Sequence, residues 1–204
     1  DWNAAVEGRF KRDWFKRARY RDSSDHWRLV DTGEIILKVS LQHAVMVDPA
    51  NRKTKASKKT AMVNFADVGR DRLLVIDAVN EKLAIEDIVP TLDAFCARRY
   101  GTATGPEWIG IEANGFQLML VKEARKPEYR NIPIVRELDP EGKSKLTRAT
   151  PAIILAEQGG VYLPEDGTAE WVEPFVDQLC RFTGDEKVDA YVDLVDCLGY
   201  YVRE

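Results

Sequence analysis

The sequence predicts an α/β fold with a mixed β-sheet flanked by helices. Two features support this prediction: strand-like segments are concentrated early in the chain, and helical and strand-like segments alternate after them. The composition agrees, since 45% hydrophobic and 31% charged residues over 204 positions are typical of a globular domain. No run of 18 apolar residues occurs, so the chain is not expected to span a membrane.

The first part of the sheet is expected to be an antiparallel meander followed by parallel strands. Residues 35–47 are apolar and partly alternating, and a strand here should end at Asp48-Pro49 because proline cannot donate a ladder hydrogen bond. Residues 60–66 and 73–79 form two further β-rich runs joined by a polar turn.

The rest of the chain alternates between helical and strand-like patterns. Apolar residues spaced three and four apart predict a helix over residues 85–96, and the short apolar run 108–111 predicts a buried strand that stops at Glu112. The other expected elements are a helix from Phe116, a strand over 132–135, a helix over 145–156, an edge strand over 161–163, and helices over 168–182 and 185–200.

Residues 1–40 are interpreted as an N-terminal extension and residues 41–204 as the main domain. The stretch 8–15 is basic and aromatic without a clear period, and residues 22–25 form a polar break.

Composition also narrows the chemistry. Two histidines and three cysteines without a C-x-x-C pair argue against a zinc ribbon, a disulfide framework and a serine–histidine triad, and the cytosol is the natural compartment. The net charge of −4 does not indicate nucleic-acid binding, but the basic residues occur in blocks. The blocks span residues 9–21, 52–59, 122–130 and 143–148, and each alone could be ordinary solvated surface.

Two acidic residues directly follow apolar strands. Asp48 ends the first long strand and Glu112 ends the 108–111 strand, where ligands bind in open α/β sheets. A partly desolvated carboxylate needs a nearby cation to stay ionised. The alternatives are an ordinary turn aspartate and a glutamate that faces water.

The last expected helix supplies a third acidic group. Asp185, Asp189 and Asp193 repeat every four residues and would stack along one side of it. The helix dipole alone explains Asp185 and Glu186, whereas Asp189 lies further in. Carboxylates without histidine or cysteine ligands favour Mg²⁺ or Mn²⁺, and paired ions of this kind cleave phosphodiesters.

Five motifs in order resemble the nuclease domain of the large terminase subunit, the DNA-packaging protein of tailed bacteriophages. They are residues 45–50 (VMVDPA), 109–115 (IGIEANG), 142–149 (GKSKLTRA), 160–164 (GVYLP) and 184–190 (GDEKVDA).

The resemblance implies an RNase H-like fold, two Mg²⁺ or Mn²⁺ ions, and cleavage of double-stranded DNA with low sequence specificity during viral genome packaging. Asp48 and Glu112 would be the first two catalytic metal ligands. The third would come from Asp185, Glu186 and Asp189, with Asp189 favoured. In this cluster the chain departs from the family pattern, which has a histidine at the position of Gly184 and an aspartate at that of Glu186.

The resemblance also implies partners. Residues 8–15 are similar to the stretch that links the family's packaging ATPase to its nuclease, and no phosphate-binding G-x-x-x-x-G-K-[ST] motif occurs. The chain is therefore expected to be a nuclease domain separated from that ATPase, working in the host cytoplasm with the portal and the small terminase subunit. The residues expected to contact the DNA backbone are Lys143, Lys145, Arg148, Lys53, Lys55 and Lys58.

Three other interpretations stay open. The chain could be another RNase H-like nuclease, such as a resolvase, a transposase or an RNase H. It could be a non-catalytic module that docks on the portal or capsid. It could also be a metabolic α/β protein whose acids are ordinary caps, although no glycine-rich phosphate loop supports this.

Overall fold

The computed structural model describes residues 8–20, 24–49, 59–113, 115, 117–139, 142–165, 167–185, 187–189 and 192–204. Lys53, Lys55, Lys58 and Glu186, all proposed as site residues, lie outside the described residues.

A nine-stranded mixed sheet forms the centre of the molecule, with the strand order β3-β2-β1-β9-β6-β5-β4-β7-β8. The strands are β1 (Lys16–Tyr20), β2 (His26–Leu29), β3 (Ile35–Leu37), β4 (Gln42–Asp48), β5 (Thr60–Asp67), β6 (Leu73–Glu81), β7 (Trp108–Glu112), β8 (Ile134–Leu138) and β9 (Val161–Pro164). Strands β4, β5 and β6 form the expected antiparallel meander, and β7 and β8 continue the sheet in parallel with β4. The predicted fold class is therefore confirmed.

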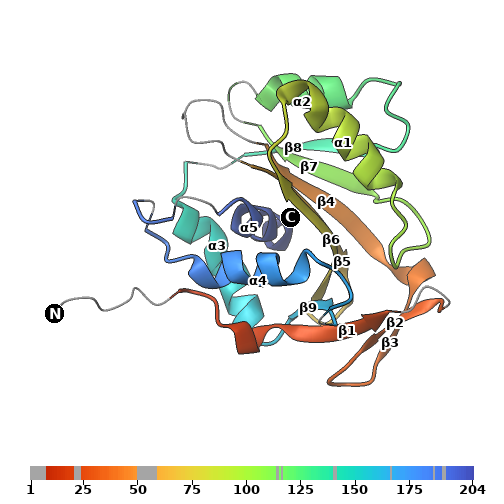
Figure 1. Cartoon of the computed structure of the whole chain (residues 1–204), viewed down its shortest axis with the longest axis vertical. Coiled ribbons are helices and arrows are strands. Elements are labelled where there is room, and N and C mark those ends of the chain that lie inside the picture. Colours follow the sequence, from red (N-terminus) through yellow and green to blue (C-terminus); the bar gives the residue numbers. More distant parts are fainter. Residues whose placement is uncertain are drawn as a thin grey trace.

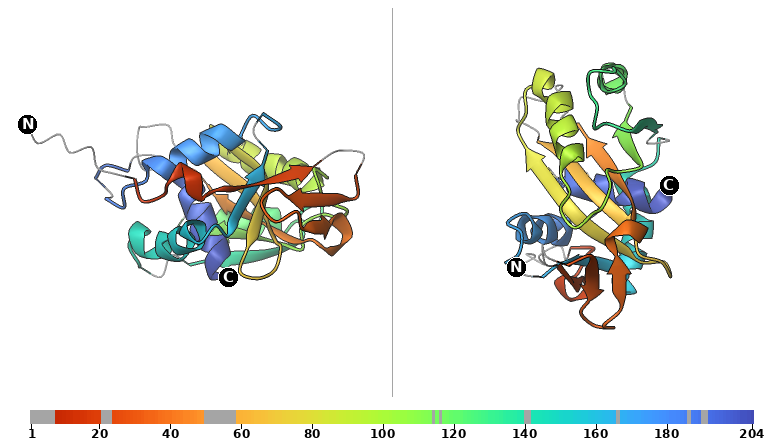
Figure 2. Two further views of the ribbon diagram at one scale, coloured as in Figure 1. Left: turned by 90° about the horizontal axis from the view of Figure 1, so that it is seen from below. Right: turned by 90° about the vertical axis from the view of Figure 1, so that its right-hand side faces the viewer.

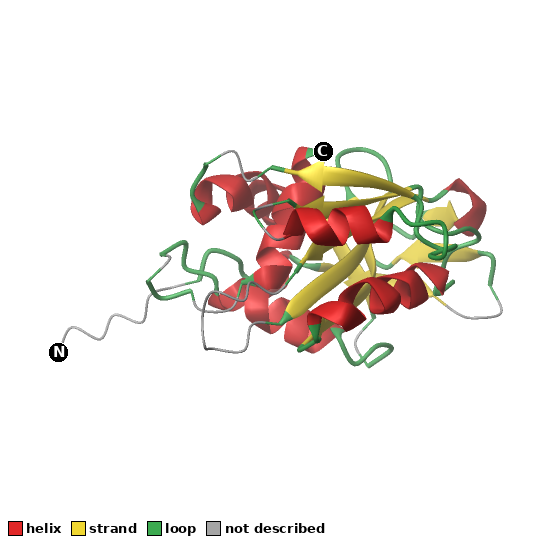
Figure 3. Cartoon of the chain, turned by 90° about the horizontal axis from the view of Figure 1, so that it is seen from above, coloured by secondary structure: helices red, strands yellow, loops and turns green. Residues whose placement is uncertain are grey.

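Helices cover both faces of the sheet (Figures 1 and 3). The helices are α1 (Ile85–Ala97), α2 (Gln117–Ala124), α3 (Lys145–Glu157), α4 (Val172–Arg181) and α5 (Asp193–Arg203). Helices α1 and α2 pack on one face, and α3, α4 and α5 pack on the other.

The sequence of β4 is nearly all apolar because both faces of this strand are buried. Its side chains alternate between the two faces, so Ala44 and Met46 pack with α3–α5 while Val45 and Val47 pack with α1 and α2. A strand buried on both faces loses the polar alternation of a half-exposed strand.

Residues 16–37 contribute three strands to the same sheet, beyond β9, at the end opposite α1 and α2 (Figure 2). They were expected to form an extension, and the structure makes them part of the sheet. Whether residues 1–40 come from a longer chain with an ATPase domain stays a prediction.

Three local predictions were wrong. The expected strand 35–47 is divided by a short 3₁₀ helix at Lys38–Ser40. Strand β9 is fully buried between β1 and β6 rather than at an edge, because it pairs in parallel with both. The last helix begins at Asp193 rather than Asp185, and Val188, which was expected on its buried face, is 55% exposed.

Candidate active site: a carboxylate cluster

The candidate site lies where β4 and β7 end. Asp48 is the last residue of β4 and Glu112 the last of β7. These strands are parallel neighbours with Val47 paired to Ile111, so both acids leave the sheet at the same edge.

Helix α5 adds two more acids to this edge. Asp193 is its first residue and Asp196 lies one turn later, and both are buried, at 8% and 6% exposure. Burial raises the pKa of Asp48 well above its usual range, and the charges of Asp196, Glu112 and Asp193 raise it further. These four carboxylates therefore act on one another electrostatically.

Glu112 is held by a neighbouring tyrosine. The Tyr200 hydroxyl donates a hydrogen bond to Glu112 Oε2 at 2.9 Å, and Tyr200 is 2% exposed. Burial raises the pKa of Glu112, whereas the hydrogen bond from Tyr200 lowers it. Tyr200 thus favours the ionised form of the half-buried Glu112 carboxylate.

Two cations from α3 face the acids. Lys145 Nζ lies 3.2 Å from Asp196 Oδ2, and Arg148 Nη2 donates to Asp196 Oδ1 at 2.7 Å. The helix begins here because the Ser144 hydroxyl accepts the backbone N–H of Thr147, and the three-residue spacing then points Lys145 and Arg148 the same way. Both were expected to contact DNA, and in the structure their immediate partner is Asp196.

Close packing of α3 against α5 brings these charges together. A Cβ atom on Gly199 would lie 3.0 Å from the backbone oxygen of Arg148, closer than ordinary packing allows. The glycine therefore permits the helix crossing that joins Arg148 to Asp196.

The predicted third cluster has a different arrangement. Asp189 accepts hydrogen bonds from the backbone N–H groups of Thr183 and Gly184 and from the Thr183 hydroxyl. The Asp185 carboxylate accepts the backbone N–H of Lys187. Because this segment is a loop with Gly184 at φ +84°, the expected stacking of Asp185, Asp189 and Asp193 does not form.

The sequence carried a signal for the acids that were missed. Asp193 and Asp196 are three residues apart at a helix start, and apolar residues follow on the same stretch. The expected helix started too early, so Asp193 was placed in its middle and Asp196 was overlooked. The selection of Asp189 as the third ligand stays a prediction.

The donor set fits a hard divalent cation. All four acids offer oxygen ligands, and Asp48 is half-buried among like charges that a cation would offset. Within the described ranges, no three aspartate, glutamate, histidine or cysteine side chains form a ready group for a metal ion. The carboxylates would therefore have to adjust their positions to share one.

Solved structures share this architecture. The large terminase nuclease from thermophilic phage G20c matches over 97% of this chain and 98% of its own, with a TM-score of 0.58 and 16% identity. The human cytomegalovirus terminase nuclease domain matches over 80% and 83%, with a TM-score of 0.56 and 12% identity.

The chain has the fold of viral terminase nucleases. A third example is the nuclease domain of the large terminase subunit of bacterial virus Sf6, with a TM-score of 0.54, 8% identity, and coverage of 79% of this chain and 87% of that one. The Sf6 domain was solved with manganese, and the G20c nuclease also with magnesium, cobalt or zinc.

The sequence itself is distant from known relatives. No protein-family model matches it, and a search of curated proteins found no match. Among the described residues, no helix has the length and apolar character needed to cross a bilayer.

Proposed function

We propose that the chain is a metal-dependent endonuclease that cleaves double-stranded DNA with low sequence specificity during viral genome packaging. The observation that carries the proposal is the carboxylate cluster around Asp48 at the ends of two parallel strands. The terminase nuclease fold supports it independently.

In this proposal Asp48, Glu112 and Asp193 are the catalytic ligands of two Mg²⁺ or Mn²⁺ ions. Bound ions of this kind would activate a water molecule and stabilise the leaving oxygen of the phosphodiester. Tyr200 orients Glu112, and Lys145 and Arg148 hold Asp196 beside the cluster. Asp189, with Asp185 and Glu186, is the alternative source of the third ligand.

The proposed substrate path uses positive charge near the cluster. Lys143 is exposed at the start of α3, next to Lys145 and Arg148, and would contact the DNA backbone. Lys53, Lys55 and Lys58 are proposed to contribute in the same way. The portal and the small terminase subunit are the proposed protein partners, and the host cytoplasm the proposed place of action.

The central experiment is digestion of supercoiled plasmid with Mn²⁺, Mg²⁺ or EDTA. We expect cleavage with either metal and none with EDTA. Asp48→Asn and Asp193→Asn should each lower the rate by at least about 100-fold, because each removes a charged ligand. Asp87→Asn, at an exposed position on α1, is the matched control and should keep most of the activity.

The same series decides between the two third ligands. If Asp189→Asn abolishes cleavage in a folded protein while Asp193→Asn stays active, the ligand is Asp189. Metal-independent cleavage, or an active Asp48→Asn variant, would contradict the proposal. Junction and RNA–DNA hybrid substrates tested in parallel separate it from other RNase H-like nucleases.

A further inference from the structure

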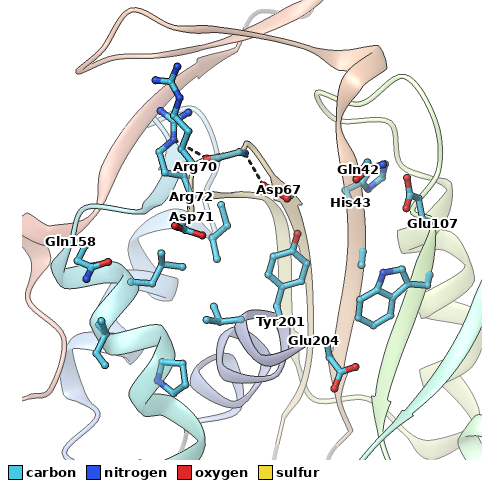
Figure 4. A pocket seen from close by; sticks show the side chains of 18 of the residues that line it. Gln42, His43, Asp67, Arg70, Asp71, Arg72, Glu107, Gln158, Tyr201 and Glu204 are labelled. Carbon is cyan, nitrogen blue, oxygen red and sulfur yellow. Dashed lines mark hydrogen bonds between the residues drawn. The ribbon is translucent and has the colours of Figure 1, made fainter.

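A large pocket lies at the opposite end of β4 from the carboxylate cluster. Its volume is about 860 Å³, and it opens beside Gln42–Ala44 at the start of β4, whereas Asp48 ends that strand (Figure 4). The end of α3, the end of α5 and the turn between β5 and β6 complete its walls. This size is typical of ligand-binding pockets.

The floor is apolar and rigidly supported. The Tyr201 ring stacks on buried Phe65 with centroids 4.8 Å apart. Ile154, which is 48% exposed, and Trp108 lie beside it. The Arg136 guanidinium lies 4.1 Å from the Trp108 ring centroid, so this ring already accepts a guanidinium.

The rim is acidic. Asp67, Asp71, Glu107 and Glu204 line it, against Arg70 and Arg72. Arg72 is already engaged, since its Nη1 donates to Glu34 at 2.9 Å and its other guanidinium nitrogens donate to backbone oxygens. Such a rim repels the phosphates of a nucleic acid.

Two of the rim acids act electrostatically on Tyr201 at the floor of the pocket. Burial raises the pKa of Tyr201, and Asp67 and Glu107 raise it further. The Tyr201 side chain points toward Asp67 in Figure 4. The apolar ring of Tyr201 and the negative charge of Asp67 and Glu107 therefore lie together in this pocket.

The turn that forms one wall is strained. Arg70 and Asp71 have φ angles of +57° and +54°, which non-glycine residues rarely adopt. Hydrogen bonds from Gly69 N to Asp67 Oδ1 and from Arg72 Nε to Gly69 O hold the turn. Backbone strain of this kind clusters at binding sites.

We propose that this pocket is a docking site for a segment of a partner protein that presents an arginine or lysine beside an apolar residue. The cation would reach Glu107 and Glu204, and the apolar neighbour would pack on Tyr201 and Ile154. Charge complementarity selects this occupant over DNA. The pocket would bind such a segment whether or not the chain is a nuclease.

The test uses three fluorescein-labelled hexapeptides that differ only in their central pair, which is Arg-Leu, Glu-Leu or Arg-Ser. By fluorescence anisotropy at low salt we expect the Arg-Leu peptide to bind with a Kd of about 10–500 μM, as suits a small contact. The other two should bind at least about five-fold more weakly.

Two variants locate the binding. Glu107→Lys/Glu204→Lys should raise the Kd of the Arg-Leu peptide at least ten-fold, and Ile154→Ser should raise it several-fold. The matched control is Glu86→Lys/Glu128→Lys, which makes the same charge change at exposed positions elsewhere and should leave the Kd unchanged. Thermal melts check that every variant is folded.

Several results would overturn the proposal. They are equal binding of the three peptides, no binding at 1 mM peptide, or an unchanged Kd in the Glu107→Lys/Glu204→Lys variant. Competition by a short DNA duplex that this variant abolishes would assign the pocket to nucleic acid instead. A dimer that forms without peptide and is lost in this variant would assign the pocket to a second copy of the chain.

Discussion

Asp48 shows how one residue can be unfavourable for folding and suited to chemistry. It is half-buried beside three other carboxylates, and both its partial burial and their charge raise its pKa. Ionisation of Asp48 therefore costs free energy unless a divalent cation binds beside it. A site of this kind is therefore less stable when empty than a neutral equivalent would be.

We expect Asp48→Asn to raise the melting temperature in EDTA at pH 7–8. Because the folded-state pKa of Asp48 is raised, its stabilising contribution is complete only below its unfolded pKa, near 4, and is lost as the pH rises through the folded pKa. The advantage of the variant should therefore vanish below about pH 4. Melting curves from pH 3.5 to 8 measure this, and a gain that persists in acid would contradict it.

Tyr200 is expected to act as a positioning residue through Glu112. Tyr200→Phe removes the hydrogen bond that lowers the pKa of Glu112, so the acidic limb of the cleavage pH profile should move to higher pH. The free energy of unfolding should fall by about 0.5–1.5 kcal/mol.

Tyr129→Phe provides the matched control for this effect. Its hydroxyl donates to Glu123 at 3.3 Å, on α2, outside the cluster. The pH profile should stay in place. An unchanged profile in Tyr200→Phe would show that Tyr200 has only a packing role.

At the level of elements, the crossing of α3 and α5 decides which charges meet. Helix α3 carries Lys145 and Arg148 at its first turn, and α5 carries Asp196 at its own. Neither helix alone specifies the pairing. Their close approach at Gly199 does.

Gly199→Ala should destabilise the protein by about 1–3 kcal/mol, although alanine is the better helix former by about 1 kcal/mol. The added Cβ would meet the backbone oxygen of Arg148 and push α3 away from α5. We also expect slower cleavage, because Arg148 and Lys145 would shift from Asp196. A raised melting temperature would contradict this account of the crossing.

The Arg148–Asp196 pair should be far more sensitive than a surface pair. Its side chains are 11% and 5% exposed, and Arg148→Ala leaves the buried Asp196 carboxylate with Lys145 as its remaining cation, which should cost about 1.5–3 kcal/mol. Arg12→Ala breaks pairs with Glu173 and Asp177 that are about half exposed and should have a much smaller effect on stability. Denaturant titration compares them.

A second substitution isolates the cause. In the Arg148→Ala background, Asp196→Asn should recover part of the lost stability because it removes a buried carboxylate that has lost one of its two cations. If the stability losses of the two single substitutions simply add in the double variant, the interaction between Arg148 and Asp196 does not explain the cost of Arg148→Ala.

At the scale of the whole molecule, the two ends of the central sheet have different characters. One end of β4 meets the carboxylate cluster and the cations of α3, and the other meets the acidic pocket. This separation would let DNA and a basic protein segment bind without competing for one surface.

If DNA binds near the cluster, Lys143→Glu should weaken binding to a random DNA duplex. The slope of log K against log salt should become shallower by about 0.9 for each phosphate that the protein no longer neutralises. Arg28→Glu, an exposed charge reversal on β2, is the matched control and should change neither value much. Equal effects of both substitutions would indicate general electrostatics rather than a local path.

Much of the fold could be predicted because it depends on local patterns. Strand-like runs ending in Asp48 and Glu112 predicted two strand ends, and the ends of β4 and β7 confirm them. The C-terminal segment was harder to predict, since the acidic spacing from Asp185 suits a helix, while the loop hydrogen bonds of Asp189 override it. These hydrogen bonds are local, but the spacing of the acids alone does not show that they form in place of a helix.

The sequence by itself determined the class of the fold, the meander and the position of two acids at strand ends, because hydrophobic periodicity and strand breakers act between near neighbours. Only the tertiary structure decided that Asp193 and Asp196 join Asp48, that Lys145 and Arg148 face inward, and that β9 is central. Those outcomes depend on contacts between residues far apart in the chain, which no local pattern encodes.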